Sequence, residues 1–254
     1  MDDWKFYDIT HSDHLICNPT NEAKLEELVE LVGLSNGGNV LEIAAGKGEL
    51  IARLIERWAV RGVAVELSPY FSRELRQKLK ERVPNADVTV IEGDGAEYRP
   101  EKPKSFDLTI CLGASWIWGG YDGTLKALLE WTRPGGQVVV GEPYWRCEPS
   151  PELLENAEYD EATIHRHWGN VTVGRELGLR LTYTIDSNLD DWDRYYALWW
   201  AAADRFVRTH PDDPDIPELM ERIEKQQANY LRWERNEMGW AIYVFRAPGR
   251  DRPS

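Results

Sequence analysis

Two hydrophobic patterns follow one another along the chain. Short runs rich in apolar and β-branched residues, such as residues 40–43, are typical of buried strands. Between them apolar residues recur every three or four positions, as in residues 49–58, which is typical of amphipathic helices. Strands that alternate with helices in this way predict an α/β fold with a parallel sheet covered on both faces. The other strands predicted in this part are residues 63–67, 88–91, 107–112 and 137–141, and the other helices are residues 21–34, 71–82 and 124–132.

After Tyr144 the regular alternation loosens. Helices are predicted at residues 151–156 and 161–177, and two further strands at residues 180–185 and 241–245. Roughly 55 residues separate these two strands, although an ordinary connection has only a few residues. The separating segment has helical periodicity in residues 192–209 and 216–235, so we expect a helical cap inserted over the ligand-binding edge of the sheet.

Length and composition fit one large domain. The chain has 254 residues, of which 42% are hydrophobic and 29% charged, which is enough apolar material for a core of its own. We expect a single domain over residues 1–254, with a ligand-binding core in residues 36–145. The other parts are an N-terminal arm and helix (1–35), a helical segment (146–178) and the cap (186–238).

Charge and cysteine content narrow the possible partners. The net charge of −14 disfavours a nucleic-acid substrate, because neutralising phosphates requires a basic surface. The three scattered cysteines have no zinc-type spacing, so we expect no metal site and reduced thiols in the cytoplasm. No apolar run approaches the ~20 residues that span a membrane, and the N-terminus lacks the features of a secretory signal. These features predict a cytoplasmic protein, and none of them indicates an oligomeric state.

A glycine-bearing turn follows the first predicted strand. The run Ala44-Ala45-Gly46-Lys47-Gly48 lies between that strand and a helix. Glycines let a backbone approach a ligand closely, and a helix N-terminus offers unpaired N–H groups. Glu66 ends the second strand 18 residues after Gly48, where a carboxylate can accept both hydroxyls of a ribose. These features fit a nucleotide cofactor, but NAD and S-adenosylmethionine (SAM) sites share them.

Other positions favour SAM over NAD. The NAD fingerprint needs a third glycine three residues after Gly48, and this chain has Ile51 there. Glu42 can orient the turn or hold the amino group of a cofactor, and Asp94 can bond an adenine amino group. A ring of carboxylates suits a ligand with an ammonium and a sulfonium, whereas it would repel a pyrophosphate. The predicted cofactor-binding residues are Glu42, Ala44, Gly46, Gly48, Glu66, Leu67, Gly93, Asp94, Gly95 and Leu112.

These motifs resemble those of class I SAM-dependent methyltransferases. The glycine turn, Glu66, Gly93-Asp94 and the turn at residues 133–136 follow in that family's order and spacing over about residues 40–142. Ala44 stands where the first motif usually has glycine. The resemblance implies a Rossmann-like, seven-stranded, mostly parallel sheet with a C-terminal antiparallel hairpin. It also implies SAM as cofactor and S-adenosyl-L-homocysteine as product.

A closer resemblance extends over almost the whole chain. Residues 112–120, the Gly-Glu-Pro-Tyr-Trp-Arg motif at 141–146, residues 191–195 and Gly239-Trp240 are similar to a little-characterised group of bacterial and archaeal methyltransferases. That group implies no particular substrate.

The acceptor should lie near the ends of the fourth and fifth strands, because open α/β sheets bind ligands outside the carboxyl ends of their strands. Ten of the twelve tryptophans lie at or after Trp116, which concentrates aromatic surface in that half. Those at helical spacing with other apolar residues, Trp131, Trp199, Trp200 and Trp233, are better explained by core packing of the cap. The Asn/Asp-Pro-Pro-Tyr segment of DNA adenine and glutamine methyltransferases is replaced here by Leu-Gly-Ala-Ser, which disfavours that reaction. The predicted acceptor-binding residues are Trp116, Tyr144, Trp145, Trp192 and Tyr195.

A general base is needed only if the nucleophile arrives protonated. The candidates are His14, Glu142 and Tyr144, with His11 as a further one, since residues 10–18 could fold over the cofactor. The leading hypothesis is a SAM-dependent methyltransferase that acts on a small molecule. The alternatives are a methyltransferase acting on tRNA or protein, an NAD-dependent oxidoreductase, and a SAM-binding module without catalysis.

Overall fold

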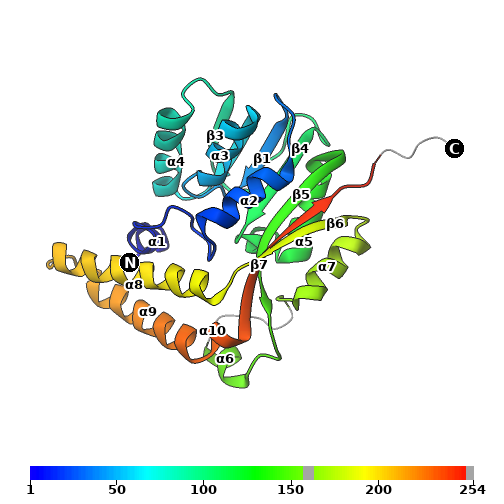
Figure 1. Ribbon diagram of the computed structural model, residues 1–254. Helices are drawn as coiled ribbons and strands as arrows, with labels where there is room; N and C mark the ends of the chain where they lie inside the picture. Colours follow the sequence, from blue (N-terminus) through cyan, green and yellow to red (C-terminus); the bar gives the residue numbers. More distant parts are fainter. Residues whose placement is uncertain (157–162, 250–254) are drawn as a thin grey trace.

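Seven strands form one mixed sheet in the order β3-β2-β1-β4-β5-β7-β6 (Figure 1). The computed structural model describes residues 1–156 and 163–249. Strands β1 to β5 are parallel, and β7 runs antiparallel to both β5 and β6. This arrangement confirms the predicted Rossmann-like fold with its C-terminal hairpin. The strands are β1 (Asn39–Ile43), β2 (Arg61–Glu66), β3 (Val88–Glu92), β4 (Phe106–Leu112), β5 (Thr132–Trp145), β6 (Arg180–Asp186) and β7 (Met238–Arg246).

Helices cover both faces of the sheet and create two separate cores. Helices α2, α3, α4 and α8 pack on one face, and α5 and α7 on the other. Side chains along a strand alternate between faces, so Ile242 of β7 enters the first core and Tyr243 the second. The helices named here are α2 (Glu22–Val32), α3 (Glu49–Trp58), α4 (Pro69–Arg82), α5 (Tyr121–Trp131), α7 (His167–Glu176) and α8 (Leu189–Thr209).

A helical insertion between β6 and β7 forms the expected cap. It comprises α8, α9 (Ile216–Asn229), a π-helical turn (Tyr230–Glu234) and α10 (Arg235–Glu237). Asn188 and Asp191 make a capping box, in which each side chain accepts the other's backbone N–H, so α8 begins directly after the strand. The predicted helix over residues 216–235 is therefore one α-helix followed by a π turn, because the hydrogen-bond register changes at Tyr230.

Two further differences concern shorter segments. Within the predicted helix 161–177, the described part becomes helical only at His167, since Arg166 is extended and serves as the N-cap; residues 161–162 lie outside the described residues. A helix near the N-terminus, α1 (Asp3–Thr10), was not predicted, and neither was the single turn η1 (Ser115–Trp118). Helix α6 (Pro151–Asn156) has its predicted bounds.

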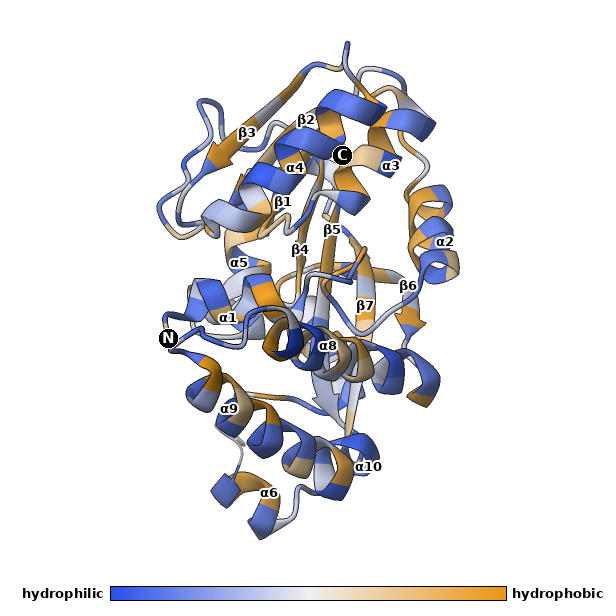
Figure 2. Ribbon diagram, turned by 90° about the vertical axis from the view of Figure 1, so that its left-hand side faces the viewer, coloured by the Kyte–Doolittle hydropathy of each residue, from blue (hydrophilic) through white to orange (hydrophobic). Residues whose placement is uncertain are grey.

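Helix α1 packs beside α8 at the carboxyl edge of the sheet (Figure 2). The ring of Phe6 meets that of Trp199 edge to face at 5.7 Å, and the guanidinium of Arg222 lies 3.7 Å from the centre of the Phe6 ring. These contacts attach the N-terminal arm to the cap. Among the described helices, none is both long and apolar enough to cross a membrane.

Candidate cofactor and acceptor site

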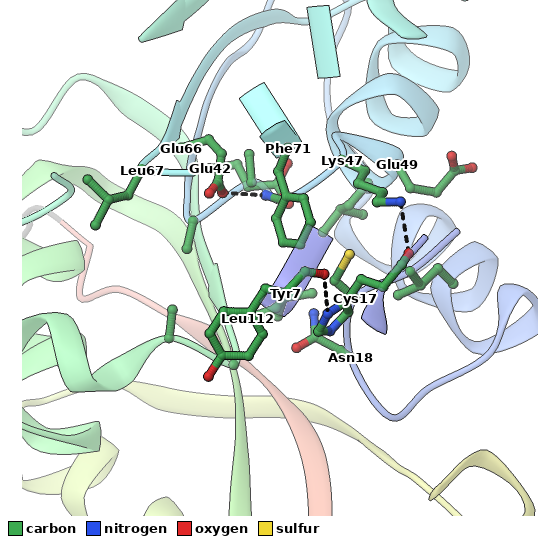
Figure 3. A pocket seen from close by; sticks show the side chains of 18 of the residues that line it. Tyr7, Cys17, Asn18, Glu42, Lys47, Glu49, Glu66, Leu67, Phe71 and Leu112 are labelled. Atoms are coloured by element: carbon green, nitrogen blue, oxygen red, sulfur yellow. Dashed lines mark hydrogen bonds between the residues drawn. The ribbon is translucent and has the colours of Figure 1, made fainter. Parts of the chain in front are cut away.

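A cavity of about 910 Å³ opens at the carboxyl ends of β1, β2 and β4 (Figure 3). One side of it is the glycine turn, and another is the loop after β4. Helix α1, the arm that follows it (residues 11–18) and α8 form the wall opposite the turn, and α2, α3 and α4 contribute a few lining residues. The cavity therefore lies between the sheet edge and two segments that are distant in sequence.

The glycine turn is a left-handed segment that only a few residue types tolerate. Ala44, Gly46 and Gly48 have φ angles of 55°, 55° and 72°. A Cβ atom on Gly48 would lie 2.7 Å from Cγ of Leu75, so a side chain there would also displace α4. Ala44 adopts the left-handed conformation without being glycine, which accommodates the departure from the usual motif.

Glu66 holds this turn from the end of β2. Its Oε2 accepts the N–H of Gly46 at 2.7 Å, and its Oε1 accepts the N–H of Ser68 at 2.8 Å (Figure 3). Burial raises the pKa of this carboxyl group, and the backbone donors act against that rise. The side chain is fixed at the cavity wall, where its remaining lone pairs fit the paired hydroxyls of a ribose.

Glu42 is a buried acid in the same wall. Burial, with a smaller contribution from the nearby Glu66 carboxylate, raises its pKa to about 8. Its Oε2 has no hydrogen-bond partner among the described residues. A buried carboxylate oxygen without a donor is costly, so this position fits the ammonium of a ligand.

The predicted cofactor residues divide into two groups. Glu42, Ala44, Gly46, Glu66, Leu67 and Leu112 line the cavity. Gly48, Gly93, Asp94 and Gly95 lie outside its lining, although the loop after β3 stands beside Glu66, whose carbonyl accepts the N–H of Gly93 at 3.0 Å. Asp94 uses its Oδ1 to accept the N–H of Ala96 at 2.8 Å.

The predicted acceptor residues also divide. Trp116, which is 66% exposed, and Tyr195 line the cavity. Tyr144 lies in the core on the other face of the sheet, where its hydroxyl donates to Asp186 at 2.8 Å. Trp145 packs against Met238 and Leu153. Trp192 stacks on Tyr230 inside the cap, so the structure brings neither Tyr144 nor these two tryptophans to the cavity.

Two of the candidate bases are buried beside the cavity. Glu142 accepts the N–H of Ser115 at 3.1 Å and so supports the loop that carries Trp116. Burial raises the pKa of Glu142 to about 7. His14 donates from Nε2 to the carbonyl of Tyr195 at 2.9 Å and lines a neighbouring cavity of about 410 Å³. Neither side chain lines the larger cavity.

The arm supplies lining residues that sequence reasoning missed. Lys47 donates from Nζ to the carbonyl of His11 at 2.9 Å and pairs with Glu74 at 3.0 Å, which fastens the arm to the glycine turn (Figure 3). A Cβ atom on Gly113 would lie 2.2 Å from Oδ1 of Asn18, so the loop after β4 approaches the arm closely. The aromatic content of residues 4–7 was the one sequence signal for these lining residues. It cannot be interpreted before the position of α1 in the fold is known. The missed lining residues include Tyr7, Cys17, Asn18, Lys47 and Phe71.

Comparisons with known proteins agree with this geometry. Residues 40–136 match the family model of a methyltransferase domain. The uncharacterized protein YjhP of Escherichia coli is 27% identical over 249 residues, which cover 96% of this chain and 98% of YjhP. A SAM-dependent methyltransferase from Geobacter sulfurreducens, solved with S-adenosyl-L-homocysteine, is 27% identical with a TM-score of 0.88, covering 95% of this chain and 97% of that one. The ubiquinone/menaquinone biosynthesis C-methyltransferase UbiE of Teredinibacter turnerae is 28% identical over 205 residues, which cover 80% of this chain and 72% of UbiE.

The domain match, the strand order and the cavity lining agree on one class of enzyme. The chain is a class I SAM-dependent methyltransferase, and SAM is its cofactor.

The buried imidazole of His14 predicts a loss of stability in acid. Burial lowers its pKa to about 4 from 6.5, so between these values the unfolded chain binds more protons than the folded one. Stability is retained above about pH 6.5 and falls as the pH approaches 4. His14→Gln keeps a donor toward Tyr195 but cannot titrate. In urea unfolding, the free energy of unfolding of the wild type should fall by about 2 kcal/mol more than that of His14→Gln between about pH 7 and pH 5. If the free energy of unfolding changes equally with pH in the two proteins, His14 is not the cause of the acid instability.

Proposed function

We propose that this methyltransferase acts on a small molecule that binds beside SAM in the cavity of about 910 Å³. The observation that carries the proposal is the composition of the walls. Residues of α1, the arm and α8 close the space over the glycine turn, and they include Trp4, Tyr7 and Trp199. Cavities of ~300–1,000 Å³ hold drug-sized ligands, so this volume suits a cofactor together with a small acceptor.

We infer a binding partner for each end of the cofactor from the cavity wall and from the loop after β3 beside it. Glu66 would accept the ribose hydroxyls, Asp94 the adenine amino group, and Glu42 the ammonium of the methionine part. The left-handed turn at Gly46 and Gly48 would let the backbone approach the ligand, with Gly93, Gly95, Leu67 and Leu112 around the adenosine. The bound cofactor supplies a methyl group on a sulfonium.

On the acceptor side, the protein's contribution would be placement. Trp116 and Tyr195 reach the cavity and would contact the acceptor. Glu142 would act as a positioning residue, because it holds the backbone of Ser115 next to Trp116. Holding the nucleophile at attack distance, in line with the methyl group, by itself accelerates methyl transfer strongly.

The other hypotheses have less support. A tRNA or protein acceptor would need a wide approach to the methyl group, whereas the arm and the cap form walls of this cavity, and the net charge is −14. A dinucleotide pyrophosphate would face the carboxylates of Glu42 and Glu66. The similarity to UbiE, whose name describes C-methylation in quinone biosynthesis, favours a small acceptor.

The remaining expectations are proposals of the same kind. We infer a single domain with residues 36–145 as the SAM-binding core and residues 186–238 as the cap. The cytoplasm fits the three cysteines, Cys17, Cys111 and Cys147, all of which are free thiols. The similarity to YjhP over 249 residues fits the little-characterised group that the sequence motifs resemble.

Removing the carboxylates should weaken cofactor binding. Glu66→Ala and Asp94→Ala each delete a charge-assisted acceptor, so we expect S-adenosyl-L-homocysteine to bind about 10- to 100-fold more weakly by calorimetry. Glu148→Ala and Asp204→Ala, both at exposed ion pairs, are matched controls that should bind like wild type. Unchanged affinity in Glu66→Ala with an intact circular dichroism spectrum would refute the assignment of the ribose site.

Protonation of Glu42 predicts that SAM binding releases a proton. With a pKa of about 8, this carboxyl group is mostly protonated at about pH 7, and a cofactor ammonium beside it would drive the proton off. Calorimetry in two buffers of different ionisation enthalpy should report about one proton released per SAM. Glu42→Gln should release almost none. Equal release from both proteins would place the ammonium elsewhere.

The size of the acceptor can be tested directly. The protein is incubated with methyl-labelled SAM and a cell extract separated by ultrafiltration into metabolites and macromolecules. We expect label in the metabolite fraction only, and at least about tenfold less with Glu66→Ala at the same SAM concentration. Label confined to protein or RNA would replace the small-molecule proposal with the macromolecular one.

A further inference from the structure

His11 and Tyr195 meet across the cavity wall, although the first lies in the arm and the second in the cap. Nε2 of His11 is 3.1 Å from the hydroxyl oxygen of Tyr195, and both residues line the cavity. Nδ1 of His11 is 3.2 Å from the backbone carbonyl of Tyr7. The contact thus connects three segments: α1, the arm and α8.

The partners of His11 fix the position of its hydrogen. A carbonyl oxygen can only accept, so Nδ1 carries the hydrogen that bonds Tyr7. In the neutral ring Nε2 then keeps a lone pair, and the hydroxyl of Tyr195 donates to it. His11 is 4% exposed, and burial together with the neighbouring His14 lowers its pKa well below 6.5, which keeps the ring neutral.

This arrangement determines what Tyr195 can offer to a ligand. A phenol has one hydrogen, and here that hydrogen is directed at His11. Any further partner of the Tyr195 oxygen must therefore be a donor. A carboxylate or phosphate placed there would meet lone pairs only.

The charges of the wall lead to the same conclusion. Lys47 is the single lysine or arginine in the cavity lining that the structure describes, and its Nζ already bonds the carbonyl of His11 and Glu74. Asp2 and Asp3 line the same cavity from α1. An anionic acceptor would thus meet only Lys47, whose charge is already paired with Glu74, whereas a cationic acceptor would find carboxylates.

Aromatic faces add to the preference for a cation. Trp4, Tyr7, Trp116 and Trp199 all line the cavity. A cation over such a ring gains roughly 0.5–2 kcal/mol, more when water is excluded. The carboxylates of Asp2 and Asp3 lie in the same wall and add attraction for a cation.

We propose that the acceptor is a small primary or secondary amine whose N–H donates to the hydroxyl oxygen of Tyr195. The inference rests on the proposed function, since it names the substrate class of the same site. The amine enters as an ammonium and gives one proton to water, which leaves a lone pair on nitrogen. That pair forms the N–C bond to the methyl carbon while the C–S bond breaks, its electrons remaining on sulfur as S-adenosyl-L-homocysteine forms. An aliphatic amine keeps its lone pair localised, so the absence of the Asn/Asp-Pro-Pro-Tyr segment is compatible with this step.

The test compares matched amines and carboxylates on the protein saturated with S-adenosyl-L-homocysteine. The probes are phenethylamine against phenylacetate, and hexylamine against hexanoate, measured by calorimetry. We expect each amine to bind at least about tenfold more tightly than its carboxylate. Tyr195→Phe should reduce amine affinity by about tenfold and leave the affinity for S-adenosyl-L-homocysteine unchanged.

Two further variants separate recognition from packing. His11→Phe keeps a ring in place but removes the acceptor of the Tyr195 hydrogen, so the hydroxyl can donate and carboxylates should bind more tightly than to wild type. Tyr183→Phe is the matched control, since its hydroxyl donates to Glu27 at 2.8 Å and lies outside the cavity lining. Its amine affinity should equal that of wild type.

The outcomes distinguish the two proposals. If S-adenosyl-L-homocysteine does not bind, the cofactor site itself fails. If it binds but neither amine does, or carboxylates bind as tightly as amines, the amine assignment is overturned while the cofactor site stands. Label transfer to macromolecules alone would remove the small-molecule proposal and this inference with it.

Discussion

The hydrogen bond from the N–H of Gly46 to Glu66 is the constraint on which the site depends. It joins the turn after β1 to the end of β2, two points that are 20 residues apart. The turn must be left-handed at Gly46 and Gly48 to direct this N–H at the carboxylate, and α3 begins directly afterwards. One buried acid therefore fixes both the floor of the cavity and the start of a helix.

The cavity is closed by a chain of contacts that begins at the same turn. Lys47 holds the carbonyl of His11, the ring of His11 accepts from Tyr195, and His14 holds the backbone carbonyl of Tyr195. The turn thus holds the arm, and the arm holds the cap. Burial lowers the pKa of both imidazoles, so His11 and His14 are neutral in these links at neutral pH.

Buried acids at the carboxyl edge serve different purposes. Glu66 is satisfied by backbone N–H groups, and Glu142 by the N–H of Ser115. Glu42 has an oxygen without a partner in the part of the chain that the structure describes. Since an unsatisfied buried oxygen costs stability, its presence beside the glycine turn is the clearest local sign that a ligand completes the site.

The sequence by itself located the strands of the sheet, most of the helices, and the glycine turn and Glu66 that line the cavity. Hydrophobic periodicity is a local property, so the strands and the cap helices could be located from it, and the turn with Glu66 has a fixed spacing within one βαβ unit. The structure also explains how the chain accommodates Ile51, the residue that argued against a dinucleotide site. Ile51 packs against Gly62 of β2, which makes room for a large side chain where the NAD motif has glycine.

The tertiary structure alone decided the acceptor half. Trp116 follows β4 in η1 and reaches the cavity, whereas Tyr144 still belongs to β5, so strand alternation turns it into the opposite core, toward Asp186. Tyr7, Asn18 and His11 belong to the cavity only because α1 packs on α8, a contact between segments about 190 residues apart. Such pairing depends on the folded positions of both segments, and no periodicity in either one encodes it.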